Sequence, residues 1–325
     1  MDYVRLGNSG LEVSAITLGM MSYGDPARGG HSWSLPEEQS RPFIMQALEA
    51  GITTFDTANV YSDGSSEEIT GRALADFATR EEVVIATKVH GRMRPGPGGQ
   101  GLSRGSIMTE VDASLKRLGT DYIDLYQIHR YDPNTPVEET MEALHDVVKA
   151  GKARYIGASS MWAWQFATMQ HAADLGGWTR FVSMQDQYNL IQREEEREML
   201  PYCLDQGVGV LPWSPLARGR LTRDFDDTTT RSETDAFGKT LYRQQEEADR
   251  RVADAVKTIA DARGVSRAQV ALAWVRQQEA VTSPIVGATK PQHLDDAIAS
   301  VELHLDDDEL VALQGPYVPR APEGF

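Results

Sequence analysis

The chain has 325 residues, of which 41% are hydrophobic and 25% charged, and its formal net charge is −16 at pH 7. This composition is that of a globular protein with a large core, and the length allows either two domains or one α/β barrel. The acidic surface repels nucleic acid and anionic membranes, so we expect neither as a partner, and an anionic ligand would need a local basic pocket.

Signals of export and membrane insertion are not visible in the sequence. The first residues, MDYVRLGNSG, lack a basic stretch followed by an apolar core, and no apolar run approaches the ~20 residues of a membrane span. Cys203 is the only cysteine, so no intrachain disulfide can form, which suits a reducing compartment. We therefore expect a cytoplasmic protein, either a monomer or a homo-oligomer.

Short apolar, β-branched runs recur along the chain, and helical patterns fall between them. A β-hairpin is expected first, because residues 3–14 alternate around an Asn-Ser-Gly turn. Helices are predicted at 36–51 and 136–151, which begin with acidic residues and end on glycine, and at 194–206, where Cys203 would be a small buried residue. The eight predicted strands are residues 15–19, 53–57, 83–88, 122–129, 153–159, 181–185, 208–214 and 282–288.

Eight β-then-α units predict a (β/α)8 TIM barrel, with residues 1–325 as one domain. The hairpin would close the bottom of this barrel, and the long loops 91–103 and 215–245 would lie at its C-terminal face. A doubly wound sheet is the alternative, but that fold usually carries a glycine-rich G-x-G-x-x-G turn after its first strand. The pattern occurs once, at 96–101, well beyond the third predicted strand and next to prolines, so we discount it.

Ionisable residues stand at the ends of three consecutive predicted strands. Asp56 ends the second strand with Tyr61 just beyond it, Lys88 ends the third and His129 ends the fourth. A barrel carries its active site at the C-terminal ends of its strands, and neighbouring strands lie roughly 4.8 Å apart. Each residue alone is commonly structural, but the convergence of all four predicts a catalytic site.

The residue types of this site indicate proton transfer to a carbonyl oxygen. A lysine cation favours the ionised form of a neighbouring tyrosine, and Asp56 would hold Lys88 in place. Such a tyrosine can give a proton to a developing alkoxide while His129 donates to the same oxygen. We expect no covalent nucleophile and no metal, so a bound hydride donor would supply the remaining chemistry.

A structural role is expected for Ser65 and Glu68. They form an S-x-x-E capping box that would start the helix after Tyr61. The box would fix the loop that carries the tyrosine.

The chain resembles the aldo-keto reductases, most closely their aryl-alcohol-dehydrogenase-like branch, which is related to potassium-channel β-subunits. The similarity covers nearly the whole chain. The motifs that carry it are FDTANVYSDGSSEE, TKVH, YIDLYQIHRYDPNTPVEETMEAL, GKARYIGASS, QDQYNL and WSPLARGRL. The resemblance implies an NADPH-dependent reductase of aromatic or hydrophobic aldehydes or ketones. Its catalytic tetrad would be Asp56, Tyr61, Lys88 and His129.

The resemblance also implies cofactor contacts. Ser159, Ser160 and Gln185 would hold the nicotinamide carboxamide, Trp213 would stack on its ring, and residues 214–219 would follow the pyrophosphate. Trp213 and the two methionines could instead pack in the core. The implied set is Gly19, Met20, Met21, Ser159, Ser160, Gln185, Trp213, Ser214, Pro215, Leu216, Ala217, Gly219, Arg220, Gly287, Ala288, Thr289, Lys290, His293 and Asp296.

The adenosine 2′-phosphate of NADPH would bind at Thr289 and Lys290, where the last predicted barrel helix begins. Two residues depart from the family pattern: His293 stands in place of Arg or Gln, and Ala297 in place of Asn. They weaken the implied preference for NADPH over NADH. Three arginines of the second long loop could clamp the pyrophosphate or remain solvated: Arg220, Arg223 and Arg231.

The substrate pocket is expected to be framed by aromatic and imidazole side chains on loops at the mouth: Tyr23, Trp33, His90, Tyr131 and Trp162. An alternative function belongs to another class. The channel β-subunits share the fold and the tetrad, so the chain could be a nucleotide-binding regulatory subunit with little turnover. The acidic surface favours the free enzyme.

Overall fold

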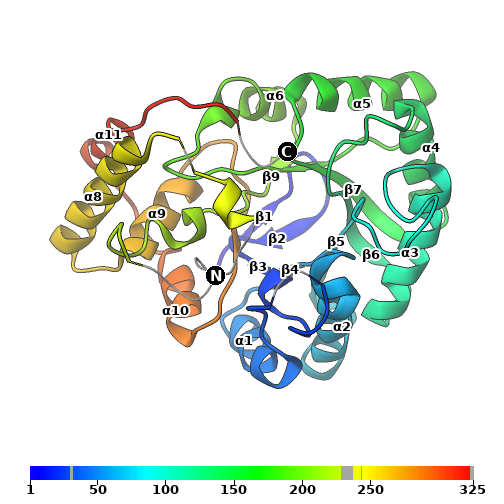
Figure 1. Ribbon diagram of the computed structural model, residues 1–325, viewed down its shortest axis with the longest axis horizontal. Helices are drawn as coiled ribbons and strands as arrows, with labels where there is room; N and C mark the ends of the chain where they lie inside the picture. Colours follow the sequence, from blue (N-terminus) through cyan, green and yellow to red (C-terminus); the bar gives the residue numbers. More distant parts are fainter. Residues whose placement is uncertain (30–31, 228–236, 243, 323–325) are drawn as a thin grey trace.

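A parallel sheet of eight strands forms the centre of the protein (Figure 1). The structure is a computed structural model that describes residues 1–29, 32–227, 237–242 and 244–322. The strand order is β10-β3-β4-β5-β6-β7-β8-β9. The strands are β3 (Thr17–Gly19), β4 (Thr54–Asp56), β5 (Val84–Val89), β6 (Ile123–Ile128), β7 (Ala153–Ser159), β8 (Ser183–Gln185), β9 (Gly209–Val210) and β10 (Ile285–Val286).

Hydrogen bonds around β10 close this sheet into a barrel. On one side, the amides of Thr282 and Ile285 donate to the carbonyls of Val210 and Pro212, each at 2.8 Å. On the other side, Thr17 N donates to Pro284 O at 3.0 Å. The predicted (β/α)8 fold is therefore confirmed, although the last two strands are shorter than the sequence predicts.

Helices surround the barrel (Figure 1). Their apolar faces point inward: on α4, Met141, Leu144 and Val147 recur every three residues and are buried. Among the described residues, no helix is both long and apolar enough to span a membrane. The helices are α1 (Glu37–Glu49), α2 (Ser65–Phe77), α3 (Arg104–Leu118), α4 (Val137–Lys149), α5 (Ala163–Gly176), α6 (Met199–Gln206), α8 (Glu246–Arg263), α9 (Arg267–Arg276), α10 (Pro291–Ala299) and α11 (Asp307–Gln314).

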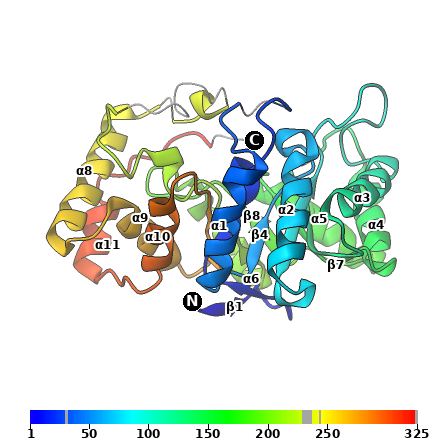
Figure 2. The same cartoon turned by 90° about the horizontal axis from the view of Figure 1, so that it is seen from below.

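The N-terminal hairpin, β1 (Tyr3–Arg5) and β2 (Glu12–Ser14), covers the bottom of the barrel as predicted. Leu6 of the hairpin turn packs in one apolar cluster with Val84, the first residue of β5. Gly7 has φ +56, and a Cβ atom there would lie 2.3 Å from the carbonyl oxygen of Gly207. Figure 2 shows β1 at one edge of the barrel and the loop 91–103 at the opposite edge.

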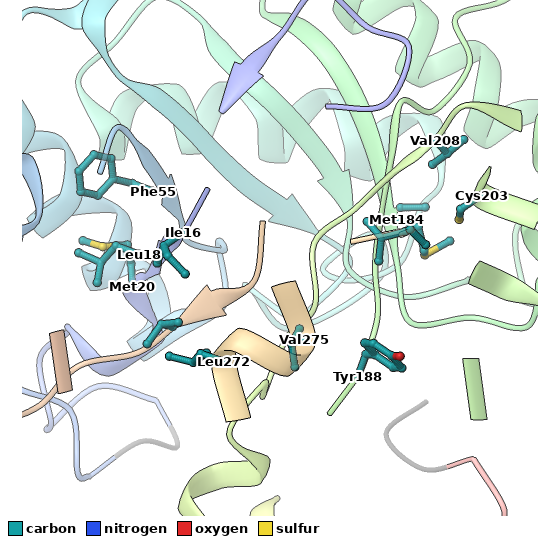
Figure 3. Close-up of a cluster of buried hydrophobic side chains, with 14 of the residues drawn as sticks. Ile16, Leu18, Met20, Phe55, Met184, Tyr188, Cys203, Val208, Leu272 and Val275 are labelled. Atoms are coloured by element: carbon teal, nitrogen blue, oxygen red, sulfur yellow. The ribbon is translucent and has the colours of Figure 1, made fainter. Parts of the chain in front are cut away.

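The predicted helix 194–206 is wrong as a continuous element. The chain forms a short turn, η4 (Glu194–Glu196), and then the separate helix α6. Pro201 explains the break, because its ring tolerates only the first turn of a helix and clashes with a carbonyl four residues earlier. Cys203 is nevertheless buried, as expected, in the cluster that also contains Met184 and Val208 (Figure 3).

Candidate active site

The ammonium group of Lys88 is the centre of a buried polar network at the C-terminal ends of β4 and β5. Its Nζ donates to Asp56 Oδ1 at 2.5 Å and to the carbonyl oxygen of Thr57 at 2.9 Å. The third contact is to Tyr61 Oη at 3.5 Å. The Lys88 side chain is 0% exposed and that of Asp56 is 4% exposed, so the pair is shielded from water.

The second carboxylate oxygen of Asp56 is held by two amides. Gln127 Nε2 donates to Oδ2 at 3.0 Å, and Gln185 Nε2 donates to it at 2.9 Å. Gln127 is not among the site residues predicted from the sequence. A signal was present, because Gln127 lies two residues before His129 and therefore on the same face of its strand. The acid that holds the lysine is itself fixed on both oxygens.

A left-handed turn positions Tyr61. Directly after the tyrosine, Ser62, Asp63 and Gly64 all have positive φ, at 45°, 51° and 84°. The chain thereby reverses and enters α2. Tyr61 lies edge-on to the His129 ring, with ring centroids 5.7 Å apart and planes at 83°. The structure therefore brings together all four residues that the strand ends predict.

The predicted capping box of Ser65 and Glu68 is wrong. Gly64 is the N-cap of α2, so the helix starts one residue earlier than the box requires. Ser65 Oγ donates to the carbonyl of Ser62 and accepts from the amide of Asp25, which ties the loop to a neighbouring segment. Glu68 instead forms an ion pair with Arg28 at 3.1 Å.

Electrostatics set the protonation of the lysine and the histidine. Burial opposes the charge on Lys88, but Asp56 and Tyr61 outweigh it and raise the pKa of the ammonium above its ordinary value. Burial, Lys88 and Arg130 all lower the pKa of His129 well below its ordinary value. At neutral pH the site therefore holds a lysine cation and an uncharged imidazole, which can donate a hydrogen bond but carries no extra proton to transfer.

The residues expected around nicotinamide form a connected cluster. Trp213 Nε1 donates to Ser160 Oγ at 3.0 Å, and Ser159 Oγ donates to the carbonyl of Gln185 at 2.9 Å. Ser160 has φ +49, and its amide donates to the same carbonyl at 3.1 Å. Because the Gln185 side chain also donates to Asp56, it links this cluster to the lysine network.

The expected pyrophosphate segment, 214–219, is an unusual turn. Ser214, Ala217 and Arg218 have φ values of 53°, 48° and 54°. The carbonyl of Ser214 accepts from Asn189 Nδ2 at 2.9 Å, which anchors the start of the turn. Of the three loop arginines, Arg220 lies over the ring of Tyr242, with 5.5 Å to the centroid, whereas Arg231 lies outside the described residues.

The expected residues after β3 and β10 lie side by side, because these strands pair. Met20 is fully buried and packs with Ile16 and Leu18, which is the core role that the sequence left open (Figure 3). Gly19 ends β3, and half-buried Met21 follows Met20. After β10 come exposed Gly287 and buried Ala288.

The expected 2′-phosphate residues lie at the N-terminus of α10. Lys290 is the N-cap and is exposed. The amide of Thr289 donates to His293 Nδ1 at 3.3 Å, so the imidazole folds back over the start of the helix. Asp296 is buried and accepts hydrogen bonds from Gln269 at 3.0 Å and Gln292 at 3.1 Å.

A cleft of about 660 Å³ opens at the mouth beside Ser160. Three of the expected substrate residues line it: His90, Tyr131 and Trp162. Half-buried Trp33 is not part of its lining. The expectation for Tyr23 is wrong, because its ring is fully buried and stacks on Phe43 at a centroid distance of 5.9 Å.

Comparison with known proteins decides the family. The family model described as "Aldo/keto reductase family" matches residues 15–316. The chain belongs to the aldo-keto reductase family. Members of this family generally use NAD(P)H and reduce carbonyl compounds, so this aldo-keto reductase is an oxidoreductase.

Fungal relatives match this aldo-keto reductase along almost its whole length. The versiconal hemiacetal acetate reductase of Aspergillus parasiticus is 50% identical over 99% of this chain and 98% of the relative. Aldo-keto reductase AMT2 of Alternaria alternata is 44% identical over 99% and 93%. A protein of Schizosaccharomyces pombe that carries aryl-alcohol dehydrogenase in its name is 44% identical over 99% and 97%.

Two buried carboxyl groups, those of Asp186 and Glu195, interact electrostatically. Asp186 is 0% exposed and Glu195 is 9% exposed. Burial and then the charge of Glu194 raise the pKa of Glu195 to about 7. Burial, and then the charge of Glu195, raise the pKa of Asp186 well above its ordinary value.

Replacing Glu195 with Gln is expected to stabilise the protein at pH 8 and to have little effect near pH 5. A carboxyl whose pKa is raised on folding contributes stability at low pH that is lost as the pH rises from 4.5 to about 7. At about 1.36 kcal/mol per pKa unit, the gain is up to about 3 kcal/mol. Urea unfolding at both pH values measures it. Glu198→Gln, at an exposed position, is the control; an equal gain there, or a gain independent of pH, would contradict the assignment.

Proposed function

We propose that this aldo-keto reductase is an NADPH-dependent enzyme that reduces an aldehyde or ketone to the alcohol. The observation that carries the proposal is the placement of Lys88, fully buried between Asp56 and Tyr61 with His129 against the tyrosine ring. Tyr61 is the proposed general acid, Lys88 and Asp56 tune it, and His129 orients the carbonyl oxygen.

The residues expected for the cofactor are compatible with a bound dinucleotide. Ser159, Ser160, Gln185 and Trp213 are joined by hydrogen bonds and connect to Asp56, so a nicotinamide held there would face the tetrad. NADPH, when bound, supplies the hydride that reduces the carbonyl carbon.

Proton transfer falls to the protein. As negative charge develops on the carbonyl oxygen, the Tyr61 hydroxyl donates to it and gives up its proton. The Lys88 cation lies 3.5 Å from Tyr61 Oη and stabilises the phenolate that results, which solvent then reprotonates. His129 is neutral and donates a hydrogen bond to the same oxygen, so it stabilises the transition state without changing its own charge.

For the substrate we propose an aromatic or hydrophobic carbonyl compound. Tyr131 and Trp162 offer aromatic surface in the cleft, and one relative carries aryl-alcohol in its name. We also propose a cytoplasmic location, which a chain with one cysteine suits.

The function is tested by following NADPH oxidation with a panel of benzaldehydes, aryl ketones and aliphatic aldehydes. We expect many turnovers per enzyme with at least one aromatic aldehyde and the matching alcohol as product. Tight binding of NADPH without turnover on any member of the panel would contradict the proposal and favour a regulatory nucleotide-binding subunit.

Lys290→Ala is expected to weaken NADPH binding by about 10-fold or more and to leave NADH binding nearly unchanged. A charge-assisted contact to the 2′-phosphate is worth about 1.5–3 kcal/mol, and each 1.4 kcal/mol is tenfold. Titrations monitored by cofactor fluorescence measure both affinities. Lys149→Ala, at an exposed position on α4, is the control. Equal losses for NADPH and NADH in Lys290→Ala would show that this lysine does not bind the 2′-phosphate.

A further inference from the structure

Arg130 places a positive charge in the wall of the cleft. It follows His129 directly, is half-buried and lines the cleft together with Tyr131 and Trp162. Its Nη1 donates to the carbonyl oxygen of His129 at 2.7 Å, so the guanidinium is held close to the catalytic histidine. A guanidinium has five N–H donors, and this is its one hydrogen bond to the residues that the structure describes.

No carboxylate of the described residues forms an ion pair with this guanidinium. Asp132 lines the same cleft, but its oxygens accept from the amides of Leu102 and Asn134 and from the hydroxyl of Thr135. Asp186 is buried and acts on Arg130 only through its field. Burial lowers the pKa of Arg130, and electrostatic interactions with Tyr61 and Asp186 offset this only in part.

Among the described residues, the charge of Arg130 therefore has no ion-pair partner, and the side chain lines the cleft at the mouth of the barrel. A half-buried cation without a counter-ion is costly, and a ligand carboxylate can relieve that cost with two parallel hydrogen bonds to the guanidinium fork. Anion binding at Arg130 would be local to this site, because the protein carries a net charge of −16 and its surface elsewhere disfavours anions.

We propose that Arg130 is a specificity residue that binds an anionic group of the substrate, so that the enzyme prefers carbonyl compounds that also carry a carboxylate. This inference rests on the proposed carbonyl reduction. The proposed substrates are aromatic aldehydes or ketones that carry an acid group. In the bound substrate, the acid group reaches Arg130 while the carbonyl oxygen lies between Tyr61 and His129. The competing role is structural, in which Arg130 only anchors the backbone of His129.

Matched substrates separate these two roles. The probes are 2-, 3- and 4-carboxybenzaldehyde and their methyl esters, which keep the ring and the aldehyde and remove only the charge. For the isomer whose acid best spans the two sites, we expect wild-type kcat/KM to favour the acid over the ester. Arg130→Met should lower that acid-to-ester ratio by about 10–100-fold, mainly through KM, and Arg130→Lys should restore part of it. Arg92→Met removes the same charge at an exposed position that is not part of the cleft lining and should leave the ratio unchanged.

The outcomes distinguish failure of this inference from failure of the proposed function. Equal losses for acid and ester in Arg130→Met would show a structural role, and a wild-type ratio near one for all three isomers would show no anion selectivity. Either result overturns the inference while the enzyme still reduces aldehydes. If no aldehyde is reduced at all, the proposed function fails, and binding then tests the site alone. Benzoate should bind the NADPH-loaded protein more tightly than benzamide, and a preference absent in the wild type or unchanged in Arg130→Met would overturn the inference.

Discussion

Tyr61→Phe is expected to lower kcat by about 10²–10⁴-fold, the usual contribution of general acid catalysis. The substitution removes only the hydroxyl that lies 3.5 Å from Lys88 Nζ and keeps the ring that packs against His129. Hydride addition leaves an oxyanion, and the barrier falls only if a group meets that charge in the transition state. The fold and the affinity for NADPH should therefore survive while turnover does not.

Lys88→Met is expected to cost kcat a similar factor, because the cation that stabilises the phenolate is lost. The double variant should lose far less than the product of the two single losses, since both changes disable one unit. Single-turnover measurements, in which chemistry limits the rate, give each loss without interference from product release. Near-normal single-turnover rates in Tyr61→Phe would show that the tyrosine is not the acid.

His129 serves as the control for this assignment. Burial and the positive charges of Lys88 and Arg130 lower the pKa of its imidazole well below the ordinary value, so it is neutral across the usual assay range. A neutral imidazole that only donates a hydrogen bond should impose no ionisation step of its own on kcat near pH 6.5. An ionisation step there that disappears in His129→Asn would assign the acid to the histidine instead.

The barrel and the convergence of the tetrad could be predicted because both depend on position along the strand. Alternating strand and helix patterns predict a barrel, and residues at the C-terminal ends of adjacent strands must meet at its mouth. The convergence of Asp56, Lys88 and His129 could be predicted from their positions at strand ends alone, without knowledge of side-chain direction. Arg130 could not be predicted in the same way. No sequence pattern shows whether an arginine that follows a strand end lines a cleft or extends into solvent.

Side-chain direction in the loops is what the sequence did not predict. Tyr23 follows the first barrel strand, but the short turn η1 (Met20–Ser22) redirects the chain so that its ring packs on Phe43 of α1. The S-x-x-E pattern at Ser65 is real, but Gly64 adopts a left-handed conformation and lets the helix begin one residue earlier. In both cases the backbone conformation of a short turn, and not the residue pattern around it, decides where the side chain lies.

The C-terminal tail shows a second kind of interaction that no local pattern predicts. Beyond α11, the chain returns to α8 through an ion pair between Arg320 and Asp249, whose side chains are each 1% exposed. The amide of Arg320 also donates to a carboxylate oxygen of Glu194 at 2.9 Å. The pair joins residues 71 positions apart, and nothing in the proline-rich sequence around Arg320 distinguishes a buried arginine from a solvated one.

Asp249→Asn is expected to destabilise the protein by about 3–5 kcal/mol, because it leaves the buried guanidinium of Arg320 without its counter-ion. Asp249→Leu combined with Arg320→Met removes both charges and should recover most of the loss, since apolar residues can replace a buried pair at little cost. Asp226→Asn breaks the exposed ion pair between Asp226, 80% exposed, and Arg250 of α8, 41% exposed, and should change the free energy of unfolding little. Urea unfolding at pH 7 compares all three. If Asp249→Asn costs no more than Asp226→Asn, the tail does not depend on this ion pair, and the hydrogen bonds to Glu194 must hold it instead.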